Sequence, residues 1–214
     1  MELKDKKVLV YGAGKSGIGA ASLLSKVGAH AVVFDEKKCE EELRELLKDV
    51  PGTSVCIGKI PEEVVSSLDL AVLSPGVPTD IEPVNALRGA GIPIWGEVEL
   101  AWQTSKGSVL GITGTNGKTT TTSLLGEIMT KAGYHTFVVG NIGNAYTDAA
   151  LMTREESVIV AELSSFQLET TCEFHPAVSA ILNITPDHLN RHHTMEEYIR
   201  CKELITKNQT KEDV

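Results

Sequence analysis

The stretch "VLGITGTNGKTTTTSLLGEIM", residues 109–129, decides the fold of this chain. Its apolar start predicts a buried strand over residues 109–112, and the residues after its glycine turn predict a helix over 119–132. A glycine turn between a buried strand and a helix lets backbone N–H groups converge on phosphate oxygens. The stretch therefore predicts an α/β unit that carries a phosphate-binding loop.

The loop departs from the usual phosphate-loop pattern GxxxxGK[ST], because Ile112 stands where that pattern has its first glycine. The chemistry survives the departure. Lys118 supplies a positive charge for the β and γ phosphates, and the Thr119 hydroxyl is placed to bind Mg²⁺. We therefore expect a nucleoside triphosphate, ATP, to be held by the loop and the start of its helix, which comprise Gly114, Thr115, Asn116, Gly117, Lys118, Thr119 and Thr120.

A second glycine loop stands near the start of the chain, in "VLVYGAGKSGIGAASLL", residues 8–24. Gly12, Gly14 and Gly17 fit GxGxxG between a strand and a helix, and Asp35 follows at the end of the next expected strand. This pattern is typical of NAD binding, although glycines that serve only helix packing would give it too. The turn Ser74-Pro75-Gly76 follows another expected strand, and it is either a further ligand contact or an ordinary turn.

Apolar runs alternate with helical periodicity along the whole chain, which predicts two parallel α/β sheets. We expect a Rossmann-like domain over residues 1–104 and a P-loop-type ATP-binding domain over 105–214. The expected strands are 7–11, 31–34, 54–57, 70–73 and 93–94, then 109–112, 136–139, 158–163 and 177–184. The expected helices are 16–27, 39–48 and 85–91, one within 96–108, then 119–132 and 195–208.

Composition excludes several classes of protein. The 214 residues carry a net charge of −9, which argues against nucleic acid or an anionic membrane as the main partner. No apolar run approaches the roughly 20 residues of a membrane span, and the start of the chain is too polar for a signal peptide. The four cysteines lack CxxC spacing, so neither a disulfide framework nor a zinc site is expected. These features predict a cytoplasmic protein.

Polar residues follow two further strands of the second unit. Glu162 ends one strand beside Ser164, and as a carboxylate near an ATP loop it is a predicted Mg²⁺ ligand. Three histidines lie within six positions after the next strand, and His188 is the one we expect to be functional. Zinc is not expected there, because no cysteine is close in sequence. On physical grounds alone, Lys202 reads as a solvated helical lysine.

The segments "GITGTNGKTTTT", "GNIG", "ELSSFQLE", "LNITPDHLNRH" and "YIRCK" together resemble the Mur ligase superfamily. The "ELSSFQLE" segment resembles the branch that adds D-glutamate to UDP-N-acetylmuramoyl-L-alanine in peptidoglycan precursor synthesis. The resemblance runs through the whole chain in unbroken order. It implies an ATP-dependent ligase that forms an amide bond through an acyl phosphate.

The resemblance also implies roles for individual residues. The first glycine loop would bind the UDP part of the substrate, not a dinucleotide. The implied substrate contacts are Lys15, Ser16, Asp35, Ser74, Pro75 and Gly76, with Asn141 and Ser164 from the second domain. Glu36-Lys37 departs from the Thr-Arg that the family carries after the strand-end Asp.

The family's catalytic residues map onto Lys118, Glu162, His188 and Lys202. Thr119 and Glu162 would hold one Mg²⁺, while His188 and an N-carboxylated Lys202 would hold a second. The partners implied are UDP-N-acetylmuramoyl-L-alanine, D-glutamate and ATP, and the full-length enzyme would be a monomer.

Mur ligases have three domains and about twice this length. We therefore expect the chain to lack the C-terminal, D-glutamate-binding domain and to be inactive alone. Two alternatives remain at this point: another Mur-type or folylpolyglutamate synthetase-like ligase, and an NAD-binding regulatory protein.

Overall fold

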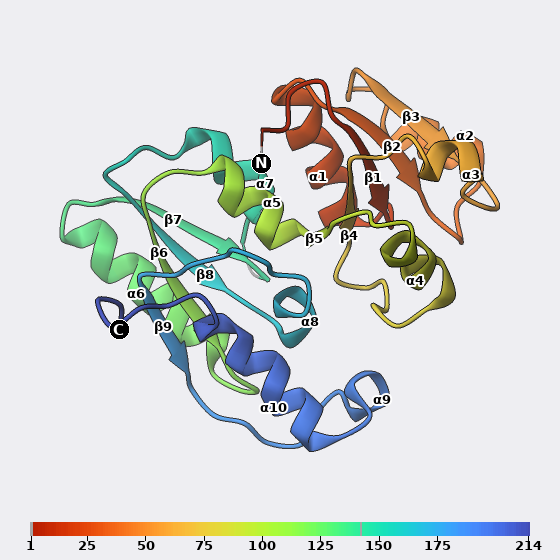
Figure 1. The fold of residues 1–214 in the computed structure, drawn as a ribbon. Helices are drawn as coiled ribbons and strands as arrows, with labels where there is room; N and C mark the ends of the chain where they lie inside the picture. The colour runs from red at the N-terminus through yellow and green to blue at the C-terminus, as the bar shows by residue number, and fades with distance from the viewer. Residues whose placement is uncertain (1, 142) are drawn as a thin grey trace. The chain divides into compact units, whose positions relative to one another are not determined.

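A computed structural model describes residues 2–141 and 143–214. The chain divides into two compact units, one formed by the residues up to Leu100 and the other by Ala101–Val214. Each unit is built around one parallel sheet with helices packed against it (Figure 1). The fold class expected from the sequence, two successive parallel α/β sheets, is confirmed.

The first unit contains a five-stranded parallel sheet in the order β3-β2-β1-β4-β5. The order reverses at β1, because β2 and β4 lie on its two sides. Ligands bind open α/β sheets at such a reversal, outside the carboxyl ends of the strands. The elements are β1 (Lys7–Tyr11), α1 (Lys15–Lys26), β2 (His30–Phe34), α2 (Glu40–Leu46), β3 (Thr53–Cys56), α3 (Glu62–Val65), β4 (Leu70–Leu73), α4 (Glu82–Gly89) and β5 (Ile94–Gly96).

Apolar side chains cover both faces of this sheet, which is why its strands read as continuous apolar runs. On one face, Leu9 and Tyr11 of β1 belong to a cluster that includes Val84 and Leu87 of α4. The alternate residues of β1 are equally buried, and α1 contacts β1, β2 and β4. The carboxyl ends of β1 and β4 are therefore held between two packed layers.

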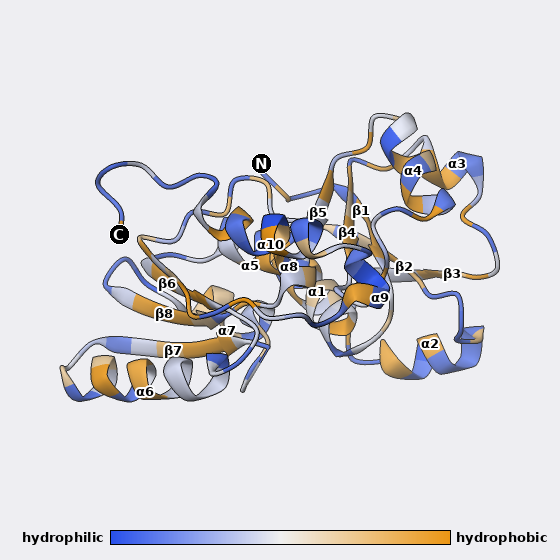
Figure 2. Cartoon of the chain, turned by 90° about the horizontal axis from the view of Figure 1, so that it is seen from below, coloured by the Kyte–Doolittle hydropathy of each residue, from blue (hydrophilic) through white to orange (hydrophobic). Residues whose placement is uncertain are grey.

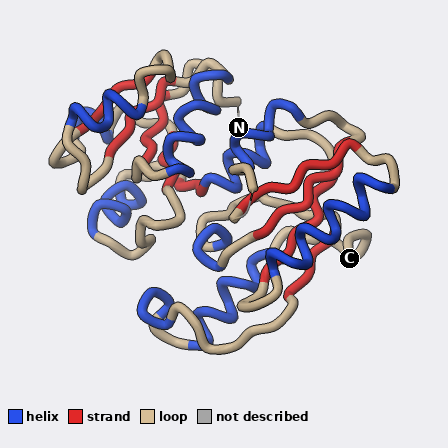
Figure 3. Tube along the Cα trace, turned by 180° about the vertical axis from the view of Figure 1, so that it is seen from behind, coloured by secondary structure: helices blue, strands red, loops and turns tan. Residues whose placement is uncertain are grey.

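The second unit contains a four-stranded parallel sheet in the order β7-β8-β6-β9. Its long helix α6 runs along the sheet and contacts β6, β7 and β8 (Figure 3). The elements are α5 (Glu97–Thr104), which crosses the division between the units, β6 (Ser108–Thr113), α6 (Lys118–Lys131), β7 (His135–Gly140), α7 (Tyr146–Ala149), η1 (Ala150–Met152), β8 (Ser157–Glu162), α8 (Ser165–Leu168), β9 (Val178–Ile181), α9 (Leu189–His192), α10 (Met195–Glu203) and η2 (Leu204–Thr206).

Hydropathy follows this layering. The inner strand β8 is buried at all six positions and is coloured mostly hydrophobic, whereas the segment after η2 is coloured mostly hydrophilic (Figure 2). Within the described residues, none of the helices combines the length and the apolar character that crossing a bilayer would require.

Nearly all expected elements form, with shifted ends. Three expectations were too long. The strand over 177–184 covers only Val178–Ile181, and the helix over 39–48 covers only Glu40–Leu46. The helix over 195–208 ends at Glu203 and continues as the 3-10 turn η2. The four-residue helices α3, α7, α8 and α9 were not expected. A helix of four residues is too short for its hydrophobic periodicity to be recognised in the sequence.

Candidate functional site

The loop between β6 and α6 is a backbone cradle at the carboxyl edge of the second sheet. Gly114 and Gly117 have φ of +146° and +83°, a region that L side chains rarely adopt, and α6 begins at the next residue, Lys118. Asn183, which follows β9 in the chain, holds the loop in place. Its carbonyl accepts from the Thr115 N–H at 2.9 Å, and its side chain exchanges hydrogen bonds with the Asn116 backbone. The cradle is therefore shaped before any ligand arrives.

The side-chain ammonium groups of two lysines contact this loop. The Lys118 ammonium donates to the carbonyl oxygens of Gly114 at 2.9 Å and Thr115 at 3.0 Å. Lys202, from α10, donates to the same Gly114 oxygen at 2.9 Å although 88 positions separate the two residues. The sequence reading of Lys202 as a solvated helical lysine was wrong on this point, since its exposed fraction is only 1%.

Burial, followed by the charge of Lys118, lowers the pKa of Lys202 to about 8. Tyr198, one helical turn earlier on α10, lies beside it, with the Lys202 ammonium 4.6 Å from the ring centroid. The Tyr198 hydroxyl also lies 3.1 Å from the Thr115 hydroxyl of the loop. Tyr198 thus joins α10 to the cradle, a contact that sequence reasoning missed.

Oxygen donors for a cation gather beside the loop. Glu162 ends β8 with an exposed fraction of 1%, and its carboxylate accepts from Thr119 at 2.8 Å and from the Asn141 side chain at 3.2 Å. Among the described residues, Glu162 forms no ion pair. A buried carboxylate without a cationic partner, next to a threonine hydroxyl, fits the oxygen preference of Mg²⁺.

Asn141 is held here by the backbone. Its N–H donates to the Glu162 carbonyl at 3.0 Å, and the preceding Gly140 approaches so closely that a Cβ there would lie 2.1 Å from the same oxygen. Thr120, in the first turn of α6, is exposed. The structure therefore brings Thr119, Asn141 and Glu162 together. The sequence analysis expected Thr119 and Glu162 to lie close enough to hold one Mg²⁺.

His188 is placed differently. It caps α9 in a left-handed conformation with φ of +52°, and its side chain is 50% exposed. In the part of the chain that the structure describes, its ring lies against Phe166 and 3.5 Å from the Asp187 carboxylate. None of these contacts is with Thr119, Glu162 or Lys202.

The neighbouring His192 is buried instead, with an exposed fraction of 2%. Its Nε2 lies 2.9 Å from the Ser165 hydroxyl and its Nδ1 lies 3.3 Å from a Glu169 carboxylate oxygen. Burial lowers its pKa, so the ring is neutral at pH 7. Sequence reasoning missed this residue, because which of several clustered histidines is buried depends on tertiary packing.

Ser164 is the N-cap residue of α8. Its hydroxyl accepts from the Gln167 N–H at 3.3 Å, and its backbone N–H donates to the Gln167 side-chain oxygen at 3.0 Å. This reciprocal pairing is a capping box, and the spacing Ser-x-x-Gln was readable in the sequence.

The first unit holds its own glycine loop. Gly12 has φ of +95°, and a Cβ on Gly17 would lie 1.7 Å from the Gly12 carbonyl oxygen, so α1 packs directly on the turn. The Ser74 hydroxyl, from the turn after β4, donates to the same oxygen at 2.8 Å. The loop after β1 and the turn after β4 are thus joined at the reversal of strand order.

Asp35 braces this loop from the end of β2. Its carboxylate accepts from the N–H groups of Ala13 and Lys37 at 2.8 and 2.9 Å. Burial raises its pKa, but these backbone hydrogen bonds outweigh burial and the pKa is lowered. The neighbouring Glu36 accepts from the Tyr11 hydroxyl.

The remaining predicted contacts line the opening of the same loop. Lys15 and Gly76 are exposed, and Ser16 and Pro75 are half-buried.

Comparison with known proteins assigns both units. The sequence profile described as "Mur ligase MurD-like, N-terminal domain" matches residues 6–96, and that described as "Mur ligase middle domain" matches residues 112–214. Both profiles belong to Mur ligases, which decides against the reading of the first loop as part of an NAD-binding regulator.

Curated relatives agree. A UDP-N-acetylmuramoylalanine--D-glutamate ligase of Lachnospira eligens is 57% identical over 215 residues, which is 100% of this chain and 48% of the relative. The enzyme of the same name from Lachnoclostridium phytofermentans is 58% identical, with 100% and 47% covered. The chain spans about half the length of the curated relatives it matches.

Among solved structures, a UDP-N-acetylmuramate:L-alanyl-gamma-D-glutamyl-meso-diaminopimelate ligase from Neisseria meningitides shares the fold, with a TM-score of 0.63 and 18% identity over 97% of this chain and 69% of that one. Two profiles matched in order along one chain, each over its own α/β unit, lead to one assignment. The chain belongs to the Mur ligase family and carries the N-terminal and middle domains of its MurD branch.

Proposed function

We propose that the chain supplies the UDP-substrate and ATP sites of a ligase that joins D-glutamate to UDP-N-acetylmuramoyl-L-alanine. The observation that carries this proposal is the cradle of the second unit, where Lys118, Thr119 and Glu162 surround one backbone loop. The curated relatives at 57% and 58% identity carry that activity in their names.

In the proposed reaction, the terminal phosphate of ATP passes to the alanyl carboxylate of the substrate, and ADP leaves. The amine of D-glutamate then attacks the acyl phosphate carbon, phosphate leaves, and an amide bond forms. Lys118 stays at the mouth of the cradle, where its charge stabilises the transferred phosphoryl oxygens. Its two present acceptors are backbone carbonyls, which it can exchange for phosphate oxygens without moving far.

Thr119 and Glu162 would hold one Mg²⁺, which supplies charge neutralisation at the phosphates. His188 and Lys202 are proposed for a second. The lowered pKa of Lys202 leaves its amine partly neutral near pH 8, so it can add CO₂ and release a proton, giving a carbamate oxygen ligand. His188 is exposed and would have to turn toward this site.

The first loop would hold the diphosphate of the UDP moiety. Its backbone faces the reversal of strand order, and the Gly12, Gly17 and Ser74 contacts fix its shape. Lys15 and Ser16 open α1, where anionic oxygens are favoured. Asp35 would act by bracing this loop as well as by contacting the ligand, because two backbone N–H groups already occupy its carboxylate.

The test is phosphate release from ATP by a protein that carries these 214 residues joined to the remaining length of its relatives. We expect release that depends on both UDP-N-acetylmuramoyl-L-alanine and D-glutamate. Turnover with L-alanine or L-lysine in place of D-glutamate would reassign the enzyme within the family.

The 214 residues alone should bind UDP ligands weakly and form no product. D-glutamate-dependent ADP release by the chain alone would contradict this part of the proposal.

A further inference from the structure

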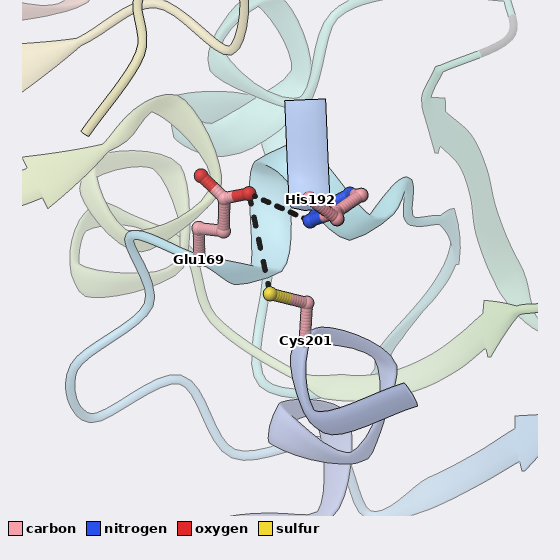
Figure 4. Close-up of side chains that lie close together, drawn as sticks. All are labelled: Glu169, His192 and Cys201. Atoms are coloured by element: carbon pink, nitrogen blue, oxygen red, sulfur yellow. Dashed lines mark hydrogen bonds and ion pairs between the residues drawn. The ribbon is translucent and has the colours of Figure 1, made fainter. Parts of the chain in front are cut away.

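Three side chains from different elements converge in the second unit. Glu169 follows α8, His192 ends α9 and Cys201 lies in α10, and one ligand atom of each falls within 4.8 Å of the others (Figure 4). His192 and Cys201 are buried, and the Glu169 side chain is 10% exposed. We name these three residues the Glu–His–Cys cluster.

We propose that the Glu–His–Cys cluster is a binding site for a divalent transition metal, with Zn²⁺ as the best match. Carboxylate, imidazole and thiol are the three ligand types that zinc uses in proteins. The sequence argument set zinc aside because no cysteine is close to the histidines. The fold removes that objection by bringing Cys201 of α10 to the end of α9.

The spacing suits a tetrahedral ion. Ligands about 2.0–2.3 Å from such an ion lie roughly 3.3–3.8 Å from one another. The His192 Nδ1 lies 3.3 Å from Glu169 Oε1, and the Cys201 Sγ lies 4.0 Å from the same oxygen. All three ligand atoms lie within 4.8 Å of one another, so the thiol has to move closer to the other two to complete the three-sided site. A water or Glu197, whose carboxylate lies 3.7 Å from the Cys201 Sγ, can take the fourth position.

The surrounding contacts match those of a metal site. Ligating histidines donate their other ring N–H to a partner, and ligating carboxylates are themselves hydrogen-bonded. His192 Nε2 lies 2.9 Å from the Ser165 hydroxyl, and Arg191 holds the second Glu169 oxygen at 2.7 Å. When the Nε2–H of His192 donates to the Ser165 hydroxyl, the lone pair of Nδ1 faces the Glu169 oxygen. A cation bound between Nδ1 and that oxygen would remove the repulsion between the two atoms.

The donor set separates this site from the proposed Mg²⁺ site. Magnesium prefers oxygen ligands and makes no use of a thiolate, whereas zinc accepts nitrogen and sulfur. A bound ion would tie the end of α8 to α9 and α10. Its role would therefore be to brace the segment that presents His188 and Lys202, independently of the proposed ligase reaction.

The experiment is a titration of the 214-residue chain with Co²⁺ in excess Mg²⁺, followed by absorption spectroscopy. We expect a thiolate-to-cobalt charge-transfer band at one equivalent that Zn²⁺ displaces. Cys201→Ser should abolish the band. Cys56→Ser, which alters another buried thiol, and Cys39→Ser, which alters an exposed one, should keep it. Ser165→Ala should weaken binding roughly tenfold to 100-fold.

A wild-type measurement guards against a variant that fails to fold. X-ray absorption of the zinc-loaded chain should show one sulfur neighbour at about 2.3 Å. A shell of nitrogen and oxygen only, the absence of a cobalt band, or a band unchanged in Cys201→Ser would each overturn the proposal and leave an ordinary His–Glu hydrogen bond.

Discussion

The carbonyl oxygen of Gly114 accepts hydrogen bonds from two lysines, Lys118 and Lys202, each at 2.9 Å. Burial disfavours the charged form of Lys202, and repulsion from the Lys118 ammonium on the same acceptor adds to this effect. Together they lower the pKa of Lys202 to about 8. Lys118 thereby increases the neutral fraction of the Lys202 amine, which is the form that the proposed reaction with CO₂ requires.

The first prediction concerns that amine. In ¹³C-bicarbonate the chain should show a carbamate resonance by NMR, because a neutral, buried lysine amine adds CO₂. Lys202→Arg should lose it, since a guanidinium stays protonated. The exposed Lys207→Arg is the matched control and should keep it. A resonance that survives Lys202→Arg would assign the modification elsewhere.

The second prediction concerns Asp35 and pH. Its folded pKa is lowered from 3.8, so its carboxylate stabilises the first unit above that pH, and the contribution is lost as pH falls through the folded value. Asp35→Asn keeps one acceptor oxygen and should cost about 1 kcal/mol at pH 7. The urea-unfolding difference from wild type should shrink below pH 3.8. The exposed Asp49→Asn should change little, and a pH-independent Asp35→Asn effect would refute the argument.

At the scale of elements, the two glycine loops have packing roles besides the phosphate binding proposed for them. A third prediction follows from α1. Gly17→Ala should destabilise the first unit by about 3 kcal/mol or more, because its Cβ would lie 1.7 Å from the Gly12 carbonyl oxygen. Gly14→Ala is the matched control, since a Cβ there meets nothing within 4 Å. Equal urea-unfolding midpoints for the two variants would contradict the packing described.

The sequence allowed the elements to be placed where periodicity is strong, and failed where tertiary contact decides. The run at residues 177–184 is mostly apolar, yet only Val178–Ile181 pairs with β6, because Leu182 and Asn183 turn toward the loop between β6 and α6. The helix α8 has four residues and is stabilised by the Ser164 capping box. The Ser-x-x-Gln spacing of this capping box could have been used to predict α8. The sequence before α9 contains no such capping signal, because its N-cap is His188 in a left-handed conformation.

The candidate site divides in the same way. Residues attached to a strand end or a glycine loop, such as Thr119 and Glu162, could be predicted, because parallel strands bring their carboxyl ends to one edge. Contacts made by α9 and α10 could not be predicted from sequence pattern, and Lys202 of α10 was assigned to the site only through the family resemblance. The pairings of His192 with Ser165 and of Tyr198 with Thr115 span 27 and 83 positions and depend on how those helices dock.

At the scale of the whole molecule, each unit carries its own glycine loop on its own sheet, and we propose an anion site at each. Ser74 and Asp35, which belong to the first unit, fix the first loop, and Asn183, which belongs to the second unit, fixes the second loop. Ligand binding by one unit should therefore survive damage to the other.

The last prediction is a double dissociation on this basis. Lys118→Ala should weaken ATP binding by tenfold or more, because a charge-assisted contact to phosphate of about 1.5–3 kcal/mol is lost, and should leave UDP binding unchanged. Gly14→Glu should do the reverse, since a carboxylate at this open loop position repels a diphosphate without a steric clash. Gly14→Gln, of nearly equal size, separates charge from bulk and should retain most of the UDP affinity. Calorimetric titration of each of the three variants with each of the two nucleotides measures these outcomes. A single variant that abolishes both affinities while its thermal unfolding stays that of the wild type would mean that the two loops serve one shared ligand, and the assignment of UDP to one and ATP to the other would fail.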